Sequence, residues 1–453
     1  MFTMIRQWSQ SQVANAQDFK AMARHVLCSG LMTICVMLLC GNSYGQNQGP
    51  QWYKGNMHTH SLWSDGNDFP EMICDWYKSR GYHFLTLSDH NILSQGEKWI
   101  SDQVPIKRGA PRALARYKIR FGDDWVTTRM TEDGKVQVRL KTLDEFRGKF
   151  EQPGEFLMIQ AEEITDHFGS LPIHINATNI GELIRPKGGE SVIETIQNNL
   201  KAVEAQRVKL NRPIMAHLNH PNFGYGVSVT QLAAATREHF FEVFNGHPSV
   251  NQRGDAKHVS IERMWDIANS LRLTHFDAPP LYGVATDDSH QYFSEQGSIP
   301  GRGWVQVRAS SLDPDLLVSS MEAGEFYAST GVTLDDVIWN ADKRTLRVQV
   351  AAESGVTYRI RFVGTRKKAA RDLAKAYQAE VADDGLSEFP EEIGQVFQEI
   401  EAAEATYELA EDQLYVRAVV TASANVERPV WADQKQMAWT QPVGWAKTEK
   451  VDR

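Results

Sequence analysis

Cysteine is scarce in this sequence. The chain of 453 residues has four cysteines, and three of them, Cys28, Cys35 and Cys40, fall in an N-terminal segment that we expect to be removed. Only Cys74 would remain, so we expect no internal disulfide in the mature protein. Cys74 stands beside Ile73 in an amphipathic stretch, which predicts a small core residue and not a nucleophile.

Long basic segments are also missing. No block of lysine and arginine is long enough to form a nucleic-acid-binding arm, and the net charge of −9 argues against a general binder of polyanions. We therefore expect no nucleic-acid partner. The hydrophobic content of 42% and the charged content of 23% are ordinary for a folded soluble protein, and the length allows one large domain and one small one.

Hydrophobic runs with the length of a membrane span, about 20 apolar residues, are not found either. The run over residues 26–40 is shorter, follows a basic pair and is followed by small residues up to Gly45. This pattern predicts a signal peptide over 1–45 that is cleaved after Gly45, and hence a secreted or periplasmic protein without a stable membrane span. A retained anchor and a lipoprotein attached through Cys40 are the alternatives, and Met22 is a second candidate for the start.

From about residue 52 to 330, short apolar runs alternate with helical patterns. Strands are predicted over 83–89, 156–164, 172–178, 213–219, 240–245, 281–287 and 303–309. Helices are predicted over 70–80, 191–208 and 258–272. Strands that alternate with helices predict an α/β fold with a mostly parallel sheet, either open or closed into a barrel.

Residues 95–155 interrupt this alternation. The segment is rich in charge and contains a predicted hairpin with Asp133 and Gly134 in its turn. An insertion of this size either forms a wall over a site or is a solvated elaboration without a role in chemistry, and the sequence leaves both readings open.

The pattern changes again after Gly331. Alternation of apolar and polar residues predicts half-buried antiparallel strands over 345–351, 356–364 and 414–422. The acidic stretch from Glu380 to Asp412 predicts a solvated helical excursion. We therefore expect one domain over 46–334 and a C-terminal β-rich domain over 335–453. Three tryptophans of the second domain either pack a small β core or line a surface groove: Trp431, Trp439 and Trp445.

The stretch NMHTHSLWSDG carries the first chemical signal. His58 and His60 have i, i+2 spacing, which places two side chains on one face of a strand, and Asp65 follows five residues later. Two imidazoles and a carboxylate suit a divalent transition metal. A single His-x-His motif is nevertheless weak evidence, because most such histidines belong to a core or a surface.

Similar residues recur at or near the ends of five predicted strands. They are Asp89, His90, Glu162, Glu163, His174, His217, His220, Asp287, Asp288 and His290. In an α/β barrel, strand ends converge on one mouth, and shared cations neutralise acids that would otherwise be costly to bury. We expect His217 to be a core histidine and Asp287 to support the site or a turn.

This ordered set, HTHSLWSDG, LSDHN, AEEIT, HPN and TDDSH, resembles the PHP family (polymerase and histidinol phosphatase domain) over about residues 52–330. The resemblance implies a distorted β/α barrel, to which the C-terminal antiparallel β-rich extension is added, and a metal-dependent phosphoesterase. The stretches EVFNGHP, PGRGW and EAGEFYASTG are most similar to a secreted branch that includes carbamate-hydrolysing members.

The resemblance also implies a site with two or three divalent ions, which can be Zn, Mn or Fe. The implied ligands are His58, His60, Asp65, Asp89, His90, Glu163, His174, His220, Asp288 and His290. Asp65, Glu163 and His220 are the expected catalytic residues, with Glu163 as the bridging ligand. Ala161 replaces a glycine that the family often has, which leaves Glu162 as an alternative bridge. The expected substrate contacts are His247, Asn245 and Arg302. Glu242, Asn245 and His247 are either substrate contacts or outer ligands, or they only pack a loop. Arg302 either binds a phosphate or is an exposed structural arginine.

The expected chemistry is hydrolysis of a small-molecule ester by metal-activated water. The chain has no Gly-x-Ser-x-Gly motif that would support a serine route. The first expectation is a phosphoesterase. A carbamate or carboxylic ester hydrolase would use the same ligands, and a metal-stabilised binding module without catalysis is the third alternative.

Overall fold

The computed structural model describes residues 49–380 and 389–446. The described chain from Pro50 onward forms one compact unit. The predicted signal peptide lies outside the described residues. Within the described residues, no helix is long and apolar enough to cross a membrane.

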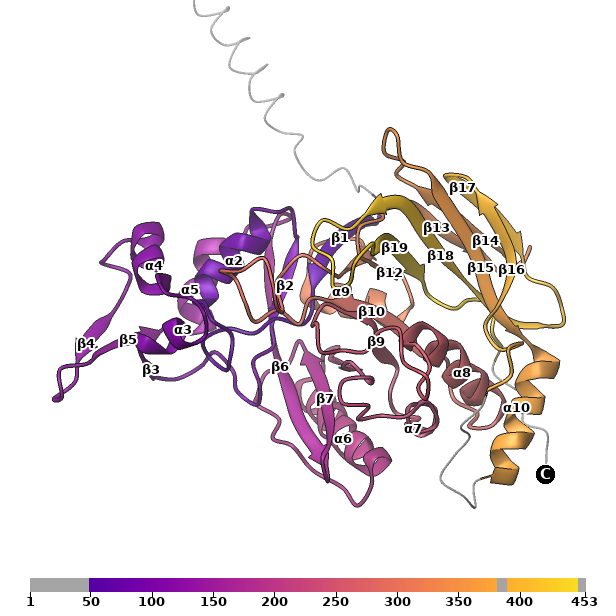
Figure 1. Cartoon of the computed structure of the whole chain (residues 1–453), viewed down its shortest axis with the longest axis horizontal. Helices are drawn as coiled ribbons and strands as arrows, with labels where there is room; N and C mark the ends of the chain where they lie inside the picture. The colour runs from indigo at the N-terminus through magenta and orange to yellow at the C-terminus, as the bar shows by residue number, and fades with distance from the viewer. Residues whose placement is uncertain (1–48, 381–388, 447–453) are drawn as a thin grey trace, which may run out of the picture. The chain divides into compact units, whose positions relative to one another are not determined.

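One large sheet runs through the described chain (Figure 1). In spatial order its strands are β10 (Tyr282–Thr286), β9 (Phe240–Asn245), β8 (Met215–Leu218), β7 (Leu171–Thr178), β6 (Leu157–Phe168), β2 (Phe84–Leu87), β1 (Gln51–Asn56), β11 (Trp304–Ala309), β12 (Phe326–Ser329), β19 (Lys435–Thr440), β18 (Gln413–Asn425), β15 (Tyr358–Arg366) and β16 (Gln395–Glu401). The pairs β1–β2, β2–β6, β8–β9 and β9–β10 are parallel. The other pairs are antiparallel. The sheet is therefore mixed, whereas we predicted a mostly parallel one.

The expected closed barrel is not present as a continuous ladder of hydrogen bonds. Strand β10 lies at one end of the sheet order, far from β1 along the ladder. The backbones of the two chain segments pair beyond the ends of their strands, at an isolated bridge between Thr59 and Ser289. There the backbone N–H of His60 donates to the carbonyl of Ser289 at 2.9 Å. This bridge brings the residues that follow β1 and β10 together without closing the sheet.

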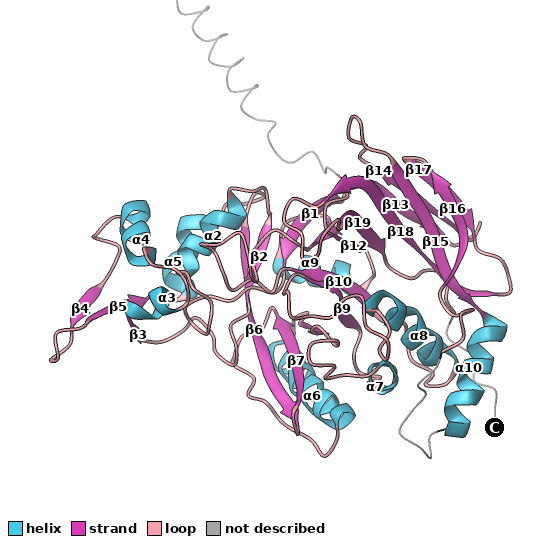
Figure 2. Cartoon of the chain, in the orientation of Figure 1, coloured by secondary structure: helices cyan, strands magenta, loops and turns pink. Residues whose placement is uncertain are grey.

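Helices flank the sheet (Figure 2). They are α2 (Pro70–Lys78), α6 (Val192–Leu210), α7 (Val229–Ala234), α8 (Ile261–Thr274), α9 (Pro314–Glu322) and α10 (Lys367–Glu380). The three helices predicted from the sequence are confirmed as α2, α6 and α8. Helix α6 begins where the Ser191 side chain accepts from the backbone N–H of Glu194, and it ends at Asn211 in the left-handed conformation, φ 48°.

The insertion over 95–155 has its own small sheet of β3 (Lys98–Ser101), β5 (Val136–Leu140) and β4 (Thr128–Met130), with helices α3 (Gln103–Lys107), α4 (Ala113–Phe121) and α5 (Leu143–Phe150). The predicted hairpin is confirmed, with Gly134 at φ 75°. The insertion shares a hydrophobic cluster with Leu62 and Trp63. It therefore supports the loop that follows His60.

The C-terminal part adds strands on the far side of β12. A second sheet of β13 (Leu334–Asn340), β14 (Thr345–Val350) and β17 (Glu404–Glu408) shares a core with β15 and β18. The prediction of a helical excursion over 380–412 is wrong for β16 and β17, which are strands. The reason is pairing with β15 and β14, which lets acidic side chains point to water while alternate residues pack inward. Trp439 is buried in the core, and Trp431 packs against it.

Candidate metal centre

The predicted ligands come together beyond the ends of the strands. His58 and His60 follow β1, His90 follows β2, His220 follows β8, and Asp288 and His290 follow β10. Glu163 lies within β6 and His174 within the neighbouring strand β7, where the ladder pairs Glu163 with Asn176 and Thr165 with His174. Their oxygen and nitrogen atoms form overlapping groups that are close enough to hold metal ions.

Glu163 is the centre of this cluster. Its Oε1 atom lies 2.9 Å from Nδ1 of His174, 3.5 Å from Nε2 of His58 and 3.6 Å from Nε2 of His220. Its Oε2 atom lies 2.7 Å from Nδ1 of His90 and 3.4 Å from Nε2 of His60. One fully buried carboxylate thus faces five imidazoles. The neighbouring Glu162 points elsewhere and accepts from the backbone N–H of Ile184 at 2.6 Å.

Asp288 provides a second carboxylate on the opposite side of His58 and His60. Its Oδ1 atom lies 3.3 Å from Nε2 of His58 and 3.2 Å from Nε2 of His60. Its Oδ2 atom lies 3.9 Å from Nε2 of His220. Asp288 and His220 have φ angles of 47° and 22°, in the left-handed region that side chains rarely adopt. Backbone strain of this kind collects at functional sites because only the surrounding structure can maintain it.

Asp65 forms the outer edge of the cluster and is half exposed. It lies 3.4 Å from Nε2 of His290, 3.5 Å from Nε2 of His90 and 3.6 Å from Nδ1 of His60. The rings of His60 and His290 are stacked, with centroids 4.0 Å apart. These four residues form the most solvent-accessible of the possible metal-binding groups.

The ring nitrogens of this cluster fit a metal. Several buried atoms have no hydrogen-bond partner among the described residues: Nε2 of His58, Nδ1 and Nε2 of His60, Nδ1 of His174 and Oε2 of Glu163. Leaving so many buried polar atoms unpaired is costly, and all of them point into one cluster. Imidazole and carboxylate are the donors that Zn, Mn and Fe accept. The donor set therefore fits divalent ions.

The carboxylates of the cluster are held in the charged form that binds metal, and against the effect of burial they raise the pKa of four histidines: His58, His90, His220 and His290. Burial acts to raise the pKa of Glu163, but His90 and His174 outweigh it and hold that pKa well below its usual range. For Asp288, burial is likewise outweighed by His58 and His60, and its pKa is also low. Burial and the neighbouring His290 and His90 lower the pKa of His60 to about 3. Charged carboxylates and a neutral imidazole are the states that metal binding requires.

Glu242 orients the inner part of the site. Its Oε1 atom accepts from Nδ1 of His58 at 2.7 Å and from the Thr286 hydroxyl at 2.6 Å, and its Oε2 atom accepts from the backbone N–H of His220 at 2.7 Å. A carboxylate behind a ligating histidine fixes its tautomer and ring orientation. This position agrees with the expectation of an outer ligand, one of the alternatives that the sequence left open for Glu242. The signal was a glutamate inside the apolar strand FFEVFN.

His217 is buried, as a core histidine would be, but it also forms a possible metal-binding group with His58 and Glu242. Its ring nitrogens have no hydrogen-bond partner among the described residues, and Nε2 lies 3.7 Å from Oε1 of Glu242. Asp287 supports a loop: its carboxylate accepts from Tyr77 and from the backbone N–H groups of Gly301, Arg302 and Gly303.

Three predicted site residues have other contacts. Both oxygens of Asp89 accept from Ser61 and Ser64, so this residue shapes the loop after His60 and does not join the metal-binding groups. Asn245 is fully buried and donates to Glu242 at 2.7 Å and to Asp288 at 3.1 Å, so it orients carboxylates and is not a substrate contact.

Arg302 is the third of these residues. Its guanidinium is 5% exposed and donates to four backbone carbonyls: Gly246, Gly297, Arg428 and Pro429. Four of the five N–H donors of the guanidinium are thus taken by carbonyls. These contacts give Arg302 a structural role, and its expected role in substrate binding stays a prediction. Arg302 joins the loops around residues 246, 297 and 428.

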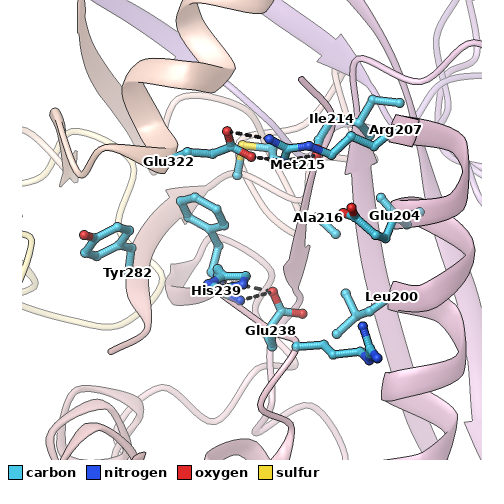
Figure 3. Close-up of a pocket in the computed structure, with 13 residues that line it drawn as sticks. Leu200, Glu204, Arg207, Ile214, Met215, Ala216, Glu238, His239, Tyr282 and Glu322 are labelled. Atoms are coloured by element: carbon cyan, nitrogen blue, oxygen red, sulfur yellow. Dashed lines mark hydrogen bonds and ion pairs between the residues drawn. The ribbon is translucent and has the colours of Figure 1, made fainter. Parts of the chain in front are cut away.

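A cavity of about 440 Å³ lies at the other end of β8, β9 and β10 (Figure 3). It is lined by the first residues of these strands, Met215, Phe240 and Tyr282, and by helix α6. Arg207 and Glu322 form an ion pair at its side. Because the possible ligands follow the last residues of the same strands, this cavity is separate from the metal cluster.

No protein-family model and no curated protein matches the sequence. Among solved structures, the chain is similar to a two-domain protein from Bacteroides vulgatus that contains a predicted PHP-like metal-dependent phosphoesterase, with 13% identity and a TM-score of 0.36 over 87% of this chain and 96% of that one.

Two further structures are similar over about half of this chain. One is a candidate metal-dependent phosphoesterase from Bifidobacterium adolescentis, with 12% identity and a TM-score of 0.30 over 55% of this chain and 91% of that one. The other is an amidohydrolase from Chromobacterium violaceum with bound sulfate and no metal, with 13% identity and a TM-score of 0.27 over 53% of this chain and 88% of that one. At these identities and TM-scores, the function has to be inferred from the residues of this chain.

Proposed function

We propose that this chain is a metal-dependent hydrolase of the PHP type that cleaves small-molecule phosphate esters. The observation that carries the proposal is the position of Glu163, whose carboxylate faces His58, His60, His90, His174 and His220 within 3.6 Å. A buried acid among unpaired imidazole nitrogens is explained by bound cations and by little else.

The ligands divide into overlapping sets. His58, His60 and Glu163 form an inner set, and His58 and His220 form another with Asp288. Two further sets are His90, Glu163 and His174, and the outer group of His60, Asp65, His90 and His290. Shared ligands allow two or three ions, for which Zn, Mn and Fe are all compatible. When bound, such ions lower the pKa of water towards about 7 and polarise the ester.

Residues of the chain position the metal ligands and the attacking water. Glu242 and Asn245 hold His58 and Asp288 in position through buried hydrogen bonds. Asp65 is half exposed at the outer edge, where it can accept a hydrogen bond from the attacking water. The insertion holds the loop after His60 in place, because the indole N–H of Trp63 donates to the carbonyl of Lys141 at 3.2 Å.

The test combines metal analysis with activity. The purified protein should contain at least two equivalents of divalent metal and hydrolyse an aryl phosphate. Glu163→Gln and His60→Ala should lose metal and most of the activity, because each removes a shared ligand. Glu162→Gln is the matched control: its carboxyl is the neighbour in sequence but binds Ile184. Full occupancy and unchanged hydrolysis in His60→Ala would contradict the proposal.

A carbamate or carboxylic ester hydrolase is the second candidate. Arg302, the cation that we had assigned to a phosphate, is occupied by backbone carbonyls. This finding favours an uncharged ester. Parallel assays with aryl phosphates, phosphodiesters, aryl carbamates and carboxylic esters distinguish the two candidates. If the metal-loaded protein hydrolyses none of them, the alternative of a binding module replaces both.

We also propose that the protein is exported. The support is the apolar run over 26–40 followed by small residues up to Gly45. N-terminal sequencing of the mature protein from an expressing bacterium should begin at Gln46. A chain that still begins at Met1 or Met22 and stays in the cytoplasm would contradict this part of the proposal.

A further inference from the structure

Two loops beside the metal cluster are fastened together. The loop after β8 carries Phe223 and the loop after β9 carries His247. An isolated bridge joins Phe223 to Val250, and the side chain of Asn222 donates to the carbonyl of Asn251 at 3.0 Å. The two loops therefore present their side chains as one surface.

The ring of Phe223 lies against the cluster. Its centroid is 5.1 Å from the ring of His220, 6.2 Å from that of His174 and 6.1 Å from that of His247. The residue packs on the hydrophobic core but remains partly exposed. An aromatic surface next to two predicted metal ligands has no role in holding metal. Its exposed part is free to contact what binds there.

His247 brings a hydrogen-bond donor to the same place. The backbone N–H of Ser249 donates to Nδ1 of His247 at 3.1 Å. Since Nδ1 accepts, the proton of the neutral ring is on Nε2. The backbone N–H of His247 donates to Oδ1 of Asn245 at 2.7 Å, and the ring lies 5.6 Å from that of His290. The side chain is thus held beside the cluster with a fixed donor.

We propose that Phe223 and His247 form the leaving-group side of the site and select esters of aromatic alcohols. This inference rests on the proposed function. The aryl ring packs against Phe223, and the Nε2–H group of His247 donates a hydrogen bond to the ester oxygen that leaves. In the reaction, the oxygen of water bonds to the phosphorus or carbonyl carbon, a proton of the water passes to the carboxylate of Asp65, and the bond to the aryl oxygen breaks. The electron pair stays on the aryl oxide, which the hydrogen bond stabilises.

Binding measures the contribution of Phe223 without any turnover. Calorimetry of the full, metal-loaded protein should show that phenylphosphonate binds more tightly than methylphosphonate. Phe223→Ala should lower the affinity for phenylphosphonate by about 3- to 10-fold, which is the contribution of an aromatic contact, and should leave the affinity for methylphosphonate unchanged. Phe223→Tyr should restore the preference. The matched control is Tyr225→Ala, because Tyr225 is in the same loop but stacks on His258, with centroids 3.6 Å apart.

The dependence of rate on the leaving group measures the contribution of His247. Across a series of substituted aryl esters, His247→Ala should make the rate depend more steeply on the pKa of the phenol, because the oxide loses its hydrogen bond. His247→Gln, which keeps an N–H donor at a similar reach, should recover part of the shallower slope. The metal content of each variant is measured alongside. An equal loss of rate for all phenols would overturn the assignment of His247.

These results separate the inference from the function on which it rests. If the protein holds metal and hydrolyses methyl and phenyl esters equally well, the leaving-group surface is overturned while the hydrolase proposal stands. The same conclusion follows if Phe223→Ala keeps the preference for phenylphosphonate. If the protein holds no metal, both are overturned.

Discussion

The Nδ1 atom of His58 lies 2.7 Å from Oε1 of Glu242, and this contact sets the direction of the ring. The opposite nitrogen, Nε2, then lies 3.5 Å from Glu163 and 3.3 Å from Asp288. Because the carboxylate accepts at Nδ1, the neutral form of the ring presents an unprotonated Nε2 to a metal. Glu242 therefore orients a predicted metal ligand without lying at the solvent-exposed edge of the cluster.

The first prediction concerns this contact. Glu242→Gln should lower metal affinity by about 10- to 100-fold, because the amide cannot fix the tautomer of His58 as a carboxylate does. Competition with a chromogenic chelator measures the affinity. Glu238→Gln is the control, since Glu238 is equally buried but lies before β9 at the opposite end of that strand. Equal affinities for wild type and Glu242→Gln would show that the contact has no such role.

The second prediction separates Asp65 from Asp89. Asp65→Asn should lower the metal content, because Asp65 is the carboxylate of the outer group. Asp89→Asn should keep the metal content but lower the free energy of unfolding by about 1–3 kcal/mol, because the carboxylate of Asp89 accepts hydrogen bonds from Ser61 and Ser64. Elemental analysis and urea titration of both variants give the two readouts. Loss of metal from Asp89→Asn at unchanged stability would restore our original assignment of Asp89 as a ligand.

The third prediction concerns the join between helix α8 and strand β18. Arg417 donates to Asp266 through Nη2 at 2.6 Å and Nε at 3.0 Å, and both side chains are buried. Removing one partner leaves a buried charge unpaired, so Arg417→Met should destabilise the protein by about 3–5 kcal/mol. The double variant with Asp266→Leu should recover much of that loss. Urea unfolding of Arg417→Met, Asp266→Leu and the double variant tests whether the two residues are coupled. If the loss of stability in the double variant equals the sum of the two single losses, the coupling is excluded.

The fourth prediction is a dependence of stability on pH. Burial raises the pKa of Glu238 to about 8. Its carboxyl accepts from the backbone N–H groups of His239 and Phe240, and the buried Arg272 donates to its carbonyl. The folded protein therefore keeps a proton that the unfolded chain releases near pH 4.5. The stabilisation is complete below that pH and is lost as the pH rises towards 8.

Glu238→Gln cannot titrate and isolates this effect. From about pH 5 to 8, the free energy of unfolding of wild type should fall relative to the variant by up to about 1.4 kcal/mol for each pH unit. Above pH 8 the difference should level off. Urea titrations at several pH values measure it. A constant difference over the whole range would mean that the Glu238 carboxyl titrates alike in the folded and unfolded chains.

The sequence by itself determined which residue types gather at the centre and where along the strands they occur. His90, His220 and Asp288 follow short apolar runs, and both the runs and their ends are local features of the sequence. The strand before His58 and His60 has no such run, and we did not predict it. The same local logic found helices α2, α6 and α8 and the hairpin at Gly134. It failed for β16 and β17, because the acidic composition of 380–412 is compatible with any solvated element and only pairing with β15 and β14 made it strand.

Tertiary structure alone decided which neighbouring groups face the centre. Consecutive residues of a strand point to opposite faces, so the choice of Glu163 over Glu162 depended on which face the rest of the chain covers. Asp89 accepts hydrogen bonds from serines that lie 25 and 28 positions before it, and Arg302 donates to carbonyls as far as 127 positions away. Contacts over such separations are set when distant segments pack, and no local pattern of residues encodes them.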